Sequence, residues 1–286
     1  MQTETFSPSG VIVNWSLTAT NRLSLIDLFE QHGYGAFAPP VTGDSVALKK
    51  ALEQYKGKSQ IVRPHKRPGV NGYEVVNEER IAKRCGANSY NHSFSAWVDE
   101  GKVDIGYGAA AVDTQRLNQL FQQEKALVSP TAVGERLGQI LDSFQPKART
   151  LYPGTRWLPN KSVPLFEPIA KGLEGLDDGN RVRCLVTTLS DPETFRDVKE
   201  SLVRDIMKAK DDIAERIASG DLSEAQISNQ REKSLALHGE IEEYETILNE
   251  GLSDLHAAVA EVERAATHAT LQVAASTMPL LAPQIF

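Results

Sequence analysis

Cationic side chains gather in one stretch of the chain, and their spacing is typical of a surface that binds phosphate groups. Positions 49–67 hold seven lysines and arginines and one histidine, against a single acid, Glu53. The phosphate backbone of nucleic acids attracts such clusters, and the nearby Tyr55 and Tyr73 could stack on bases. A solvated loop that balances acidic charge elsewhere in the protein produces the same pattern. The candidate nucleic-acid contacts are Lys49, Lys50, Lys56, Lys58, Arg63, Lys66 and Arg67.

Three short motifs resemble fragments of nucleotide-binding or catalytic sites, and none is complete. Gly57-Lys58-Ser59 matches the end of a phosphate-binding loop, but that loop also needs a glycine at position 52, where the chain has leucine. Gly106-Tyr107-Gly108 is too short for a dinucleotide-binding fingerprint. Glu100 and Lys102 have the acid-x-lysine spacing of some metal-dependent nucleases, but they occupy a predicted turn. We therefore predict no catalytic residue and no cofactor, while an enzyme with a site dispersed along the sequence stays an alternative.

The histidines form no metal-binding motif, because none lies at ligand spacing from another histidine or from a cysteine. His92 and Cys85 are seven positions apart, and no third ligand accompanies them. We therefore predict no metal site. The six histidines are His32, His65, His92, His238, His256 and His268.

Length and composition predict a globular protein of one or two domains. The 286 residues are 41% hydrophobic and 24% charged, which is sufficient for a packed core. The two cysteines form no disulfide framework and favour a reducing compartment; Cys184 falls in a predicted strand, where we expect it to be buried. The N-terminal segment has no cationic leader, and no apolar run reaches the roughly 18 residues of a membrane span. We therefore expect a cytoplasmic protein that does not contact membranes.

The first half of the chain alternates between predicted strands and helices. A period of two over residues 11–18 predicts a half-buried strand, and short helices are expected over about 21–33 and 44–55. Two short strands, at 60–62 and 73–76, are expected to flank a long basic loop. Turn-forming residues between two segments rich in β-formers then predict a hairpin that ends near Tyr107.

The next segments favour a sheet that is covered by helices. Apolar residues at helical spacing predict helices over about 113–127 and 130–144. A strand at 155–159, a helix at about 163–176 and a strand at 181–189 follow. Because such a unit accompanies an antiparallel hairpin, we predict an α+β fold with a mixed sheet and covering helices over residues 1–189.

The C-terminal part of the chain predicts a long antiparallel helical hairpin. Apolar residues recur at spacings of three and four up to Ile217, and Ser219-Gly220 ends this first helix. A capping box that starts at Ser223 begins a second helix, which is expected to reach about Val273 with a kink or a handover at Gly251. Residues 190–275 thus form the predicted arm, with its tip near Gly220.

The two predicted helices of the arm differ in length, so part of the second helix needs another partner. Its spacing is nearly a heptad repeat from Leu248 onward, which favours a helix from a second copy of the chain. Packing on the α/β body of the same chain is the alternative. The candidate oligomer contacts are Leu248, Leu252, Leu255, Val259 and Val262.

Charge and hydropathy separate the arm from the rest of the chain. Residues 166–286 carry 12 Lys and Arg against 23 Asp and Glu, whereas residues 1–165 carry 19 against 15. A mildly basic body is therefore expected to join an acidic arm. The last segment, 276–286, is an apolar tail broken by prolines, and it is expected either to fold back on the body or to dock elsewhere as an extended peptide.

The order of these features resembles an uncharacterised family of bacteria and their phages. The resemblance rests on Gly10-Val11-Ile12-Val13-Asn14-Trp15-Ser16-Leu17 near the start, on Gly154-Thr155-Arg156-Trp157-Leu158-Pro159 later, and on the terminal helical pair. It covers most of the chain as a pattern. It implies a bacterial or phage origin, and it implies no activity and no site residues.

We therefore predict a non-enzymatic, self-associating interaction or scaffold protein that uses the acidic arm for assembly. A nucleic-acid-binding accessory protein that uses residues 49–67 is the main alternative. Neither the stoichiometry of assembly nor the identity of the partner follows from the sequence.

Overall fold

The protein has an α+β fold, as the sequence predicts, in two compact units whose segments interleave along the chain. The computed structural model describes residues 9–67, 70–80, 88–219 and 223–277. Unit 1 consists of Met1–Ser16, Gly138–Lys171 and Arg181–Phe286, and unit 2 consists of Leu17–Leu137 and Gly172–Asn180. Two of the unit boundaries fall within helices α4 (Pro130–Asp142) and α5 (Val163–Leu176), and the other two follow Ser16 and Asn180.

Unit 1 is built on a four-stranded antiparallel sheet with the strand order β10-β1-β9-β8. Strand β1 lies between β10 and β9, so that Ile12 is opposite both Leu185 and Trp157. Because side chains alternate between the faces of a sheet, Ile12 and Trp157 share one face and Val11 and Leu158 share the other. The strand bounds are β1 Gly10–Ser16, β8 Arg149–Tyr152, β9 Thr155–Pro159 and β10 Arg181–Thr187.

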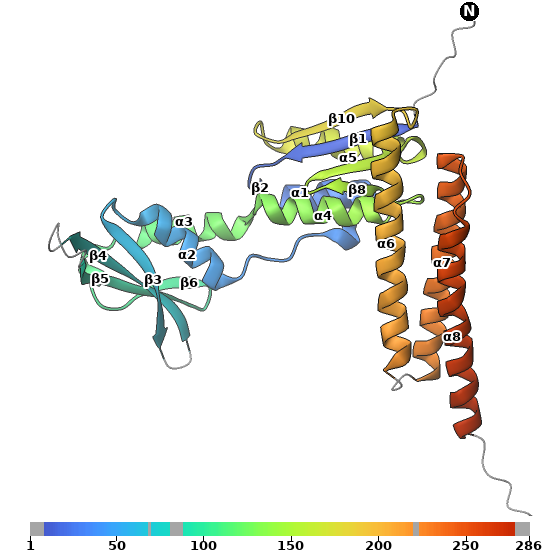
Figure 1. The fold of residues 1–286 in the computed structure, drawn as a ribbon. Coiled ribbons are helices and arrows are strands. Elements are labelled where there is room, and N and C mark those ends of the chain that lie inside the picture. The colour runs from blue at the N-terminus through green and yellow to red at the C-terminus, as the bar shows by residue number, and fades with distance from the viewer. Residues whose placement is uncertain (1–8, 68–69, 81–87, 220–222, 278–286) are drawn as a thin grey trace, which may run out of the picture. The chain divides into compact units, whose positions relative to one another are not determined.

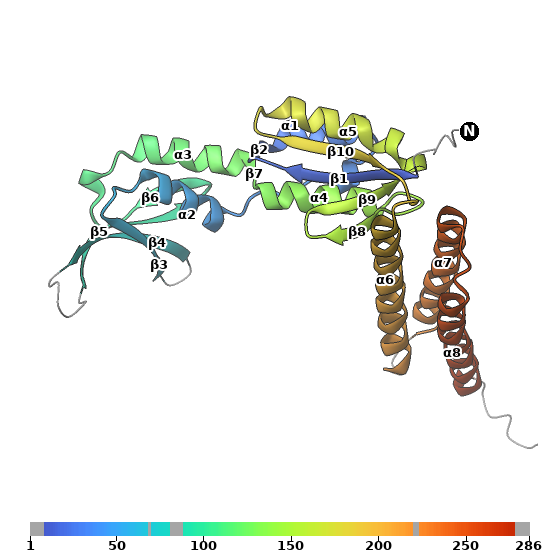
Figure 2. The same ribbon diagram turned by 45° about the horizontal axis from the view of Figure 1, so that its top comes forward.

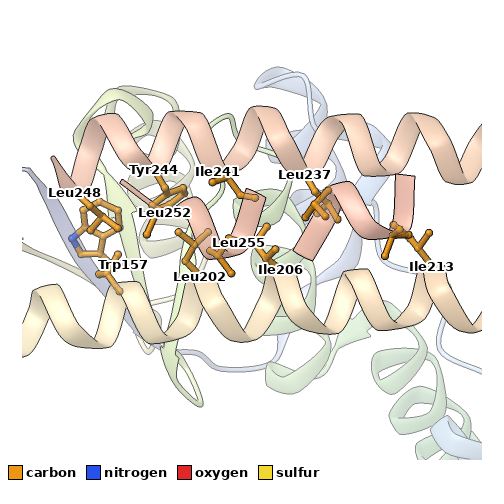
Figure 3. Close-up of a cluster of buried hydrophobic side chains, with 13 residues drawn as sticks. Trp157, Leu202, Ile206, Ile213, Leu237, Ile241, Tyr244, Leu248, Leu252 and Leu255 are labelled. Carbon is orange, nitrogen blue, oxygen red and sulfur yellow. The ribbon is translucent and has the colours of Figure 1, made fainter. Parts of the chain in front are cut away.

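Three long helices form the core of unit 1 together with Trp157 (Figure 3). They are α6 (Pro192–Ala218), α7 (Glu224–Leu248) and α8 (Ser253–Thr277). Asp191 caps α6 by accepting a hydrogen bond from the Thr194 N–H, and Ser223 and Gln226 form the predicted capping box of α7. The apolar stripes of the three helices meet in one cluster, which includes Ile206, Ile241 and Val259.

The long second helix of the predicted arm is divided into two helices, so the arm has three helices instead of two. Asn249 ends α7 with a left-handed backbone conformation, φ 52°, and α8 turns back at once after Gly251. The α8 helix packs against both α6 and α7 (Figure 1). A near-heptad repeat does not reveal this reversal, because the same stripe serves a continuous helix or two antiparallel ones.

Unit 2 contains a second antiparallel sheet, with the order β3-β4-β5-β6, and helices α2 and α3 lie on one of its faces (Figures 1 and 2). Val75 and Phe94 of the sheet and Leu48 and Leu117 of the helices are buried in this core. A short ladder joins β2 to β7. The bounds are β2 Thr20–Asn21, α1 Arg22–Gln31, α2 Asp44–Tyr55, β3 Gln60–Arg67, β4 Val70–Arg80, β5 Asn88–Asp99, β6 Lys102–Ile105, α3 Thr114–Ala126 and β7 Leu127–Val128.

Two local predictions are wrong. Residues 63–67 and 70–72, predicted as a basic loop, extend β3 and β4, and Pro64 is tolerated because β3 is an edge strand of the sheet. Cys184 lies in a strand as predicted, but it is exposed, because the burial of this face of β10 does not extend from Val182 to Cys184. Most of the predicted apolar tail, residues 278–286, lies outside the described residues.

Candidate ligand-binding cleft

A cleft opens in unit 1 between α6, α7 and the segment that follows α4. It consists of two adjoining cavities of about 560 Å³ and about 490 Å³. Both are lined by Lys147, Ala209, Asp212, Leu237 and Glu240, so the two cavities are neighbours. Each cavity is within the size range of small-molecule sites in proteins.

Apolar side chains form one part of the wall of the larger cavity. Phe144, Ile213 and Leu237 line it, and each side chain is otherwise buried. Ile213 and Leu237 occupy positions of the apolar stripes of α6 and α7, which explains why these side chains turn towards the core. Gly239 also lines the cavity, and a Cβ atom added there would meet no other atom within 4 Å. The helix surface is therefore open at this position.

The same cavity contains one buried polar group without a partner. The Gln230 side chain of α7 is only 4% exposed, and its Oε1 accepts no hydrogen bond from any described residue. A buried acceptor without a donor costs about 1–3 kcal/mol of stability, so native proteins usually provide it with a partner. Because Gln230 also lines the cavity, its Oε1 is the candidate acceptor for an N–H or O–H group of a bound molecule.

The rim of the larger cavity carries charges of both signs. Asp212 and Arg216 extend from α6, and Lys233 and Glu243 extend from α7. None of the four forms an ion pair with another residue in the part of the chain that the structure describes. The rim has as many cations as acids, so its charge does not select strongly between anionic and cationic ligands.

A buried cluster around Arg149 closes the other end of the cleft. The Arg149 guanidinium forms ion pairs with Glu240 and with Asp205, the latter at 3.4 Å, and it lies over the Tyr244 ring, 4.2 Å from its centre. Glu240 also pairs with Lys147 at 3.0 Å. The Tyr244 hydroxyl donates a hydrogen bond to the Lys147 carbonyl oxygen at 2.5 Å. These contacts connect β8 to α6 and α7 and hold Glu240 in place at the cleft.

Burial shifts the acid–base behaviour of this cluster. It raises the pKa of Tyr244 to about 12, although the adjacent Arg149 opposes part of the rise. Burial by itself lowers the pKa of Arg149, but its interactions with Tyr244 and Glu240 outweigh that effect and raise it. Since Tyr244 is protonated at neutral pH, Glu240 and Asp205 supply the negative charge beside Arg149 there.

The predicted nucleic-acid contacts whose side chains the structure describes lie on α2, in the segment that follows it and on β3. Lys49 and Lys50 lie on α2, and Lys50 pairs with Glu124 at 3.6 Å. Lys56 pairs with Glu53 at 2.9 Å. Lys58 is exposed in the turn before β3, and the side chains of Lys66 and Arg67 lie outside the described part of the chain.

Arg63 belongs to the face of the sheet that points away from α2, because it alternates with Val62, which packs against the core beneath α2. Its guanidinium lies 3.7 Å from the centre of the Tyr90 ring. The two tyrosines expected to stack on bases are engaged within the unit. Tyr55 packs edge-on against Phe94, and the Tyr73 hydroxyl lies 3.0 Å from the Ser45 hydroxyl.

The predicted oligomer contacts lie inside the chain's own core. Leu248, Leu252, Leu255, Val259 and Val262 are all at most 6% exposed, and all belong to the cluster shared by the three helices (Figure 3). Because the chain reverses between α7 and α8, its own helices cover the apolar stripe for which the sequence predicted another partner. The stripe is therefore buried without a second copy of the chain.

Metal sites, membrane spans and similarity to known proteins are the other features that could indicate a function. Within the described residues, no group of three or more His, Cys, Asp or Glu side chains could hold a metal ion, and no helix has the length and apolar character of a membrane span. The sequence gives one signal for the cleft: the stripe of α7 has polar residues at Gln230 and Ser234, two positions that turn out to be buried. Comparison of the chain with protein-family models, with curated proteins and with solved structures finds no match.

Proposed function

We propose that this chain is a binding protein whose helical cleft takes a small organic molecule with an apolar body and a hydrogen-bond donor. The observation that carries this proposal is the unpartnered Oε1 of Gln230 in the wall of the 560 Å³ cavity. An apolar pocket with a few polar groups that fix orientation is the usual form of a ligand site. Phe144, Ile213 and Leu237 would contact the body of the ligand, and Gln230 would accept its N–H or O–H hydrogen.

The cleft supports this function better than the surfaces on which the alternatives depend. Self-association through residues 248–262 would require contacts that the chain's own core already buries. Nucleic-acid binding through residues 49–67 would use cations of which Lys50 and Lys56 already pair with Glu124 and Glu53. By contrast, the groups that line the cleft surround two neighbouring cavities.

Calorimetric titration with three flat probes of similar shape tests the proposal. Benzamidine and benzamide carry N–H donors, the first as a cation and the second as a neutral molecule, whereas benzoate has only acceptors. We expect both donors to bind in a one-to-one ratio at millimolar concentration and benzoate to bind at least about tenfold more weakly, because an acceptor leaves Oε1 unpaired. Equal binding of benzoate would contradict the proposal.

A variant of Gln230 assigns the binding to the cleft. Gln230→Met keeps the length of the side chain but removes the acceptor, so the donor probes should bind at least about tenfold more weakly. The same change should raise the stability of the free protein by about 1–3 kcal/mol, since a buried unpaired group is lost. Asn229→Met, at the exposed neighbouring position on α7, is the matched control and should alter neither quantity. Unchanged probe binding by Gln230→Met would contradict the proposal.

A further inference from the structure

Two histidines meet between α7 and α8, outside the cleft. His238 of α7 and His256 of α8 face each other with their Nδ1 atoms 3.0 Å apart. The ring planes differ by 12°, and the ring centres are 5.3 Å apart. This separation is the Nδ1–Nδ1 distance plus the two centre-to-nitrogen distances, so both nitrogens lie on the line between the centres. The two Nδ1 atoms therefore point at each other, in the geometry of a straight N–H···N hydrogen bond.

The short gap between the two Nδ1 atoms has room for one hydrogen. With no hydrogen there, two lone pairs would face each other and repel. With two hydrogens, these atoms would lie roughly 1 Å apart, because each N–H bond takes up about 1 Å of the gap. One Nδ1 therefore donates and the other accepts, so the protonation states of the two rings depend on each other.

A carboxylate faces the other nitrogen of each ring. The Nε2 atom of His256 lies 3.4 Å from Glu245, and the Nε2 atom of His238 lies 3.8 Å from Glu263. The Leu252 N–H, and to a lesser degree His256, lower the pKa of Glu245, so this carboxylate is ionised at neutral pH. Among the described residues, these two glutamates form the ion pairs of both rings, and α6, the third helix of this core, contributes none.

We propose that His238 and His256 share one hydrogen and together carry one positive charge, which makes the pair a pH-sensitive contact that holds α8 against α7. One hydrogen on each Nε2 faces a carboxylate, and a third hydrogen lies between the Nδ1 atoms. Three hydrogens on four ring nitrogens correspond to one imidazolium and one neutral imidazole. The pair thus places a single positive charge between Glu245 and Glu263.

Both the gain and the loss of a proton weaken this contact. A second positive charge in acid puts two N–H groups into the Nδ1 gap, so the rings must move apart. Loss of the proton leaves either two lone pairs in that gap or one lone pair that faces a carboxylate. Histidines of the unfolded chain gain and lose protons independently around about pH 6.5. The folded pair binds fewer protons than the unfolded chain below that pH and more above it, so the contact stabilises the fold most near about pH 6.5.

A double-mutant cycle at several pH values tests the proposal on the full chain. Urea unfolding of the wild type, His238→Ala, His256→Ala and the double variant gives the coupling free energy between the two rings. We expect a favourable coupling near about pH 6.5 that decreases towards both pH 5 and pH 8. A cycle that pairs His238→Ala with His268→Ala should give no coupling, because His268 is exposed on the same helix as His256. A coupling that is independent of pH, or that changes steadily in one direction, would overturn the proposal.

One further variant tests the charge of the pair. Glu263→Gln keeps both rings but removes one of the two carboxylates that support the positive charge. In this background the decrease of the coupling on the alkaline side should therefore begin at a lower pH than in the wild type. Glu261→Gln, at an exposed position of α8, is the matched control and should leave the profile unchanged. An alkaline decrease at the same pH in Glu263→Gln and the wild type would contradict the single positive charge.

Nuclear magnetic resonance of the wild-type chain tests the shared hydrogen directly and keeps the proposal testable if a variant unfolds. With ¹⁵N-labelled histidine at about pH 6.5, we expect a nitrogen–nitrogen coupling between the two Nδ1 atoms and a hydrogen on both Nε2 atoms. At about pH 5 the coupling should weaken, together with the hydrogen-exchange protection of the α8 amides around His256. Two rings that show no coupling in the folded chain at about pH 6.5 would reject the shared hydrogen.

Discussion

The Glu245 side chain accepts a hydrogen bond from the backbone N–H of Leu252 at 2.6 Å, across the turn that separates α7 from α8. Leu252 is the first residue after the turn, and its carbonyl oxygen already accepts a hydrogen bond from the His256 N–H at 3.2 Å. The contact therefore ties the end of one helix to the start of the next. It fixes the reversal that lets α8 cover α6 and α7.

Glu245→Ala should lower the thermal stability of the chain measurably, because the Leu252 N–H loses its acceptor and α8 loses its anchor. The Leu252 N–H and His256 lower the pKa of Glu245, so the stability that this carboxylate adds is present above the ordinary carboxyl range and is lost as the pH falls through the lowered pKa. The difference in thermal stability between the wild type and Glu245→Ala should therefore become smaller at acidic pH. Glu242→Ala, at an exposed position of α7, is the control. An equal loss in both variants at neutral pH would contradict the role of this contact.

Removing the Tyr244 hydroxyl should alter how stability depends on alkaline pH. The pKa of about 12 in the folded protein lies above the ordinary value of 10, so Tyr244 stabilises the fold fully below about pH 10 and progressively less from there to about pH 12. Two pKa units correspond to about 3 kcal/mol. In urea unfolding at about pH 9, the wild type should have a higher free energy of unfolding than Tyr244→Phe, because the variant lacks the hydrogen bond to the Lys147 carbonyl oxygen. The difference in free energy of unfolding between the two proteins should decrease between about pH 10 and pH 11. A difference that stays constant over this range would show that Tyr244 is not buried as described.

Substitutions in the stripe of α8 distinguish an intramolecular core from an assembly surface. Leu255 is 5% exposed and Val259 is fully buried, so Leu255→Ala should cost about 2–5 kcal/mol and Val259→Asp should unfold unit 1 by burying an unpaired charge. Leu271 lies on the same helix but is 65% exposed, and Leu271→Asp should leave the fold intact. Circular dichroism measures whether each variant is folded, and light scattering measures its oligomeric state. A folded, monomeric Val259→Asp protein derived from an oligomeric wild type would instead support assembly through this stripe.

Gly239 offers a way to change the cleft without disturbing the core. Gly239→Ala should raise the free energy of unfolding by about 0.5–1 kcal/mol, because glycine weakens a helix interior and the added Cβ meets open space. Gly239→Trp should fill part of the cavity and prevent binding of the donor probes. Gly175 of α5 also has open space at its Cβ, so Gly175→Trp is a control that leaves the cleft unchanged. Probe binding that persists in folded Gly239→Trp would show that the probes bind elsewhere.

The regular elements follow from the sequence wherever local signals agree. The bounds of α2 match the predicted 44–55, and the hairpin of β5 and β6 matches the turn residues between them. The extensions of β3 and β4 do not follow, because their pairing is set by cross-strand partners such as Arg63 and Glu74, which lie far apart in sequence. The short strand β8 is missed for the same reason, since it forms only beside β9.

The candidate sites depend on tertiary structure to a greater degree. Gln230 and Ser234 interrupt the stripe of α7, but their burial depends on how α6 and α8 close around that helix. His238 and His256 meet only because the chain reverses after Asn249. On one continuous helix, two residues 18 positions apart would be about 27 Å from each other. They come into contact only when the chain turns back between them into a second, antiparallel helix.

The side-chain amide of Gln230 provides the most direct measurement. In ¹H–¹⁵N spectra of the full chain, one side-chain NH₂ pair disappears in Gln230→Met and is thereby assigned to Gln230. During titration with benzamide, this pair should shift progressively and saturate together with the backbone amides of Leu237 and Ile213, while the NH₂ pair of the exposed Asn229 should stay in place. That result would place a hydrogen-bond donor at the buried acceptor. A Gln230 pair that does not move while the probe saturates would contradict the assignment of this cleft as the ligand site.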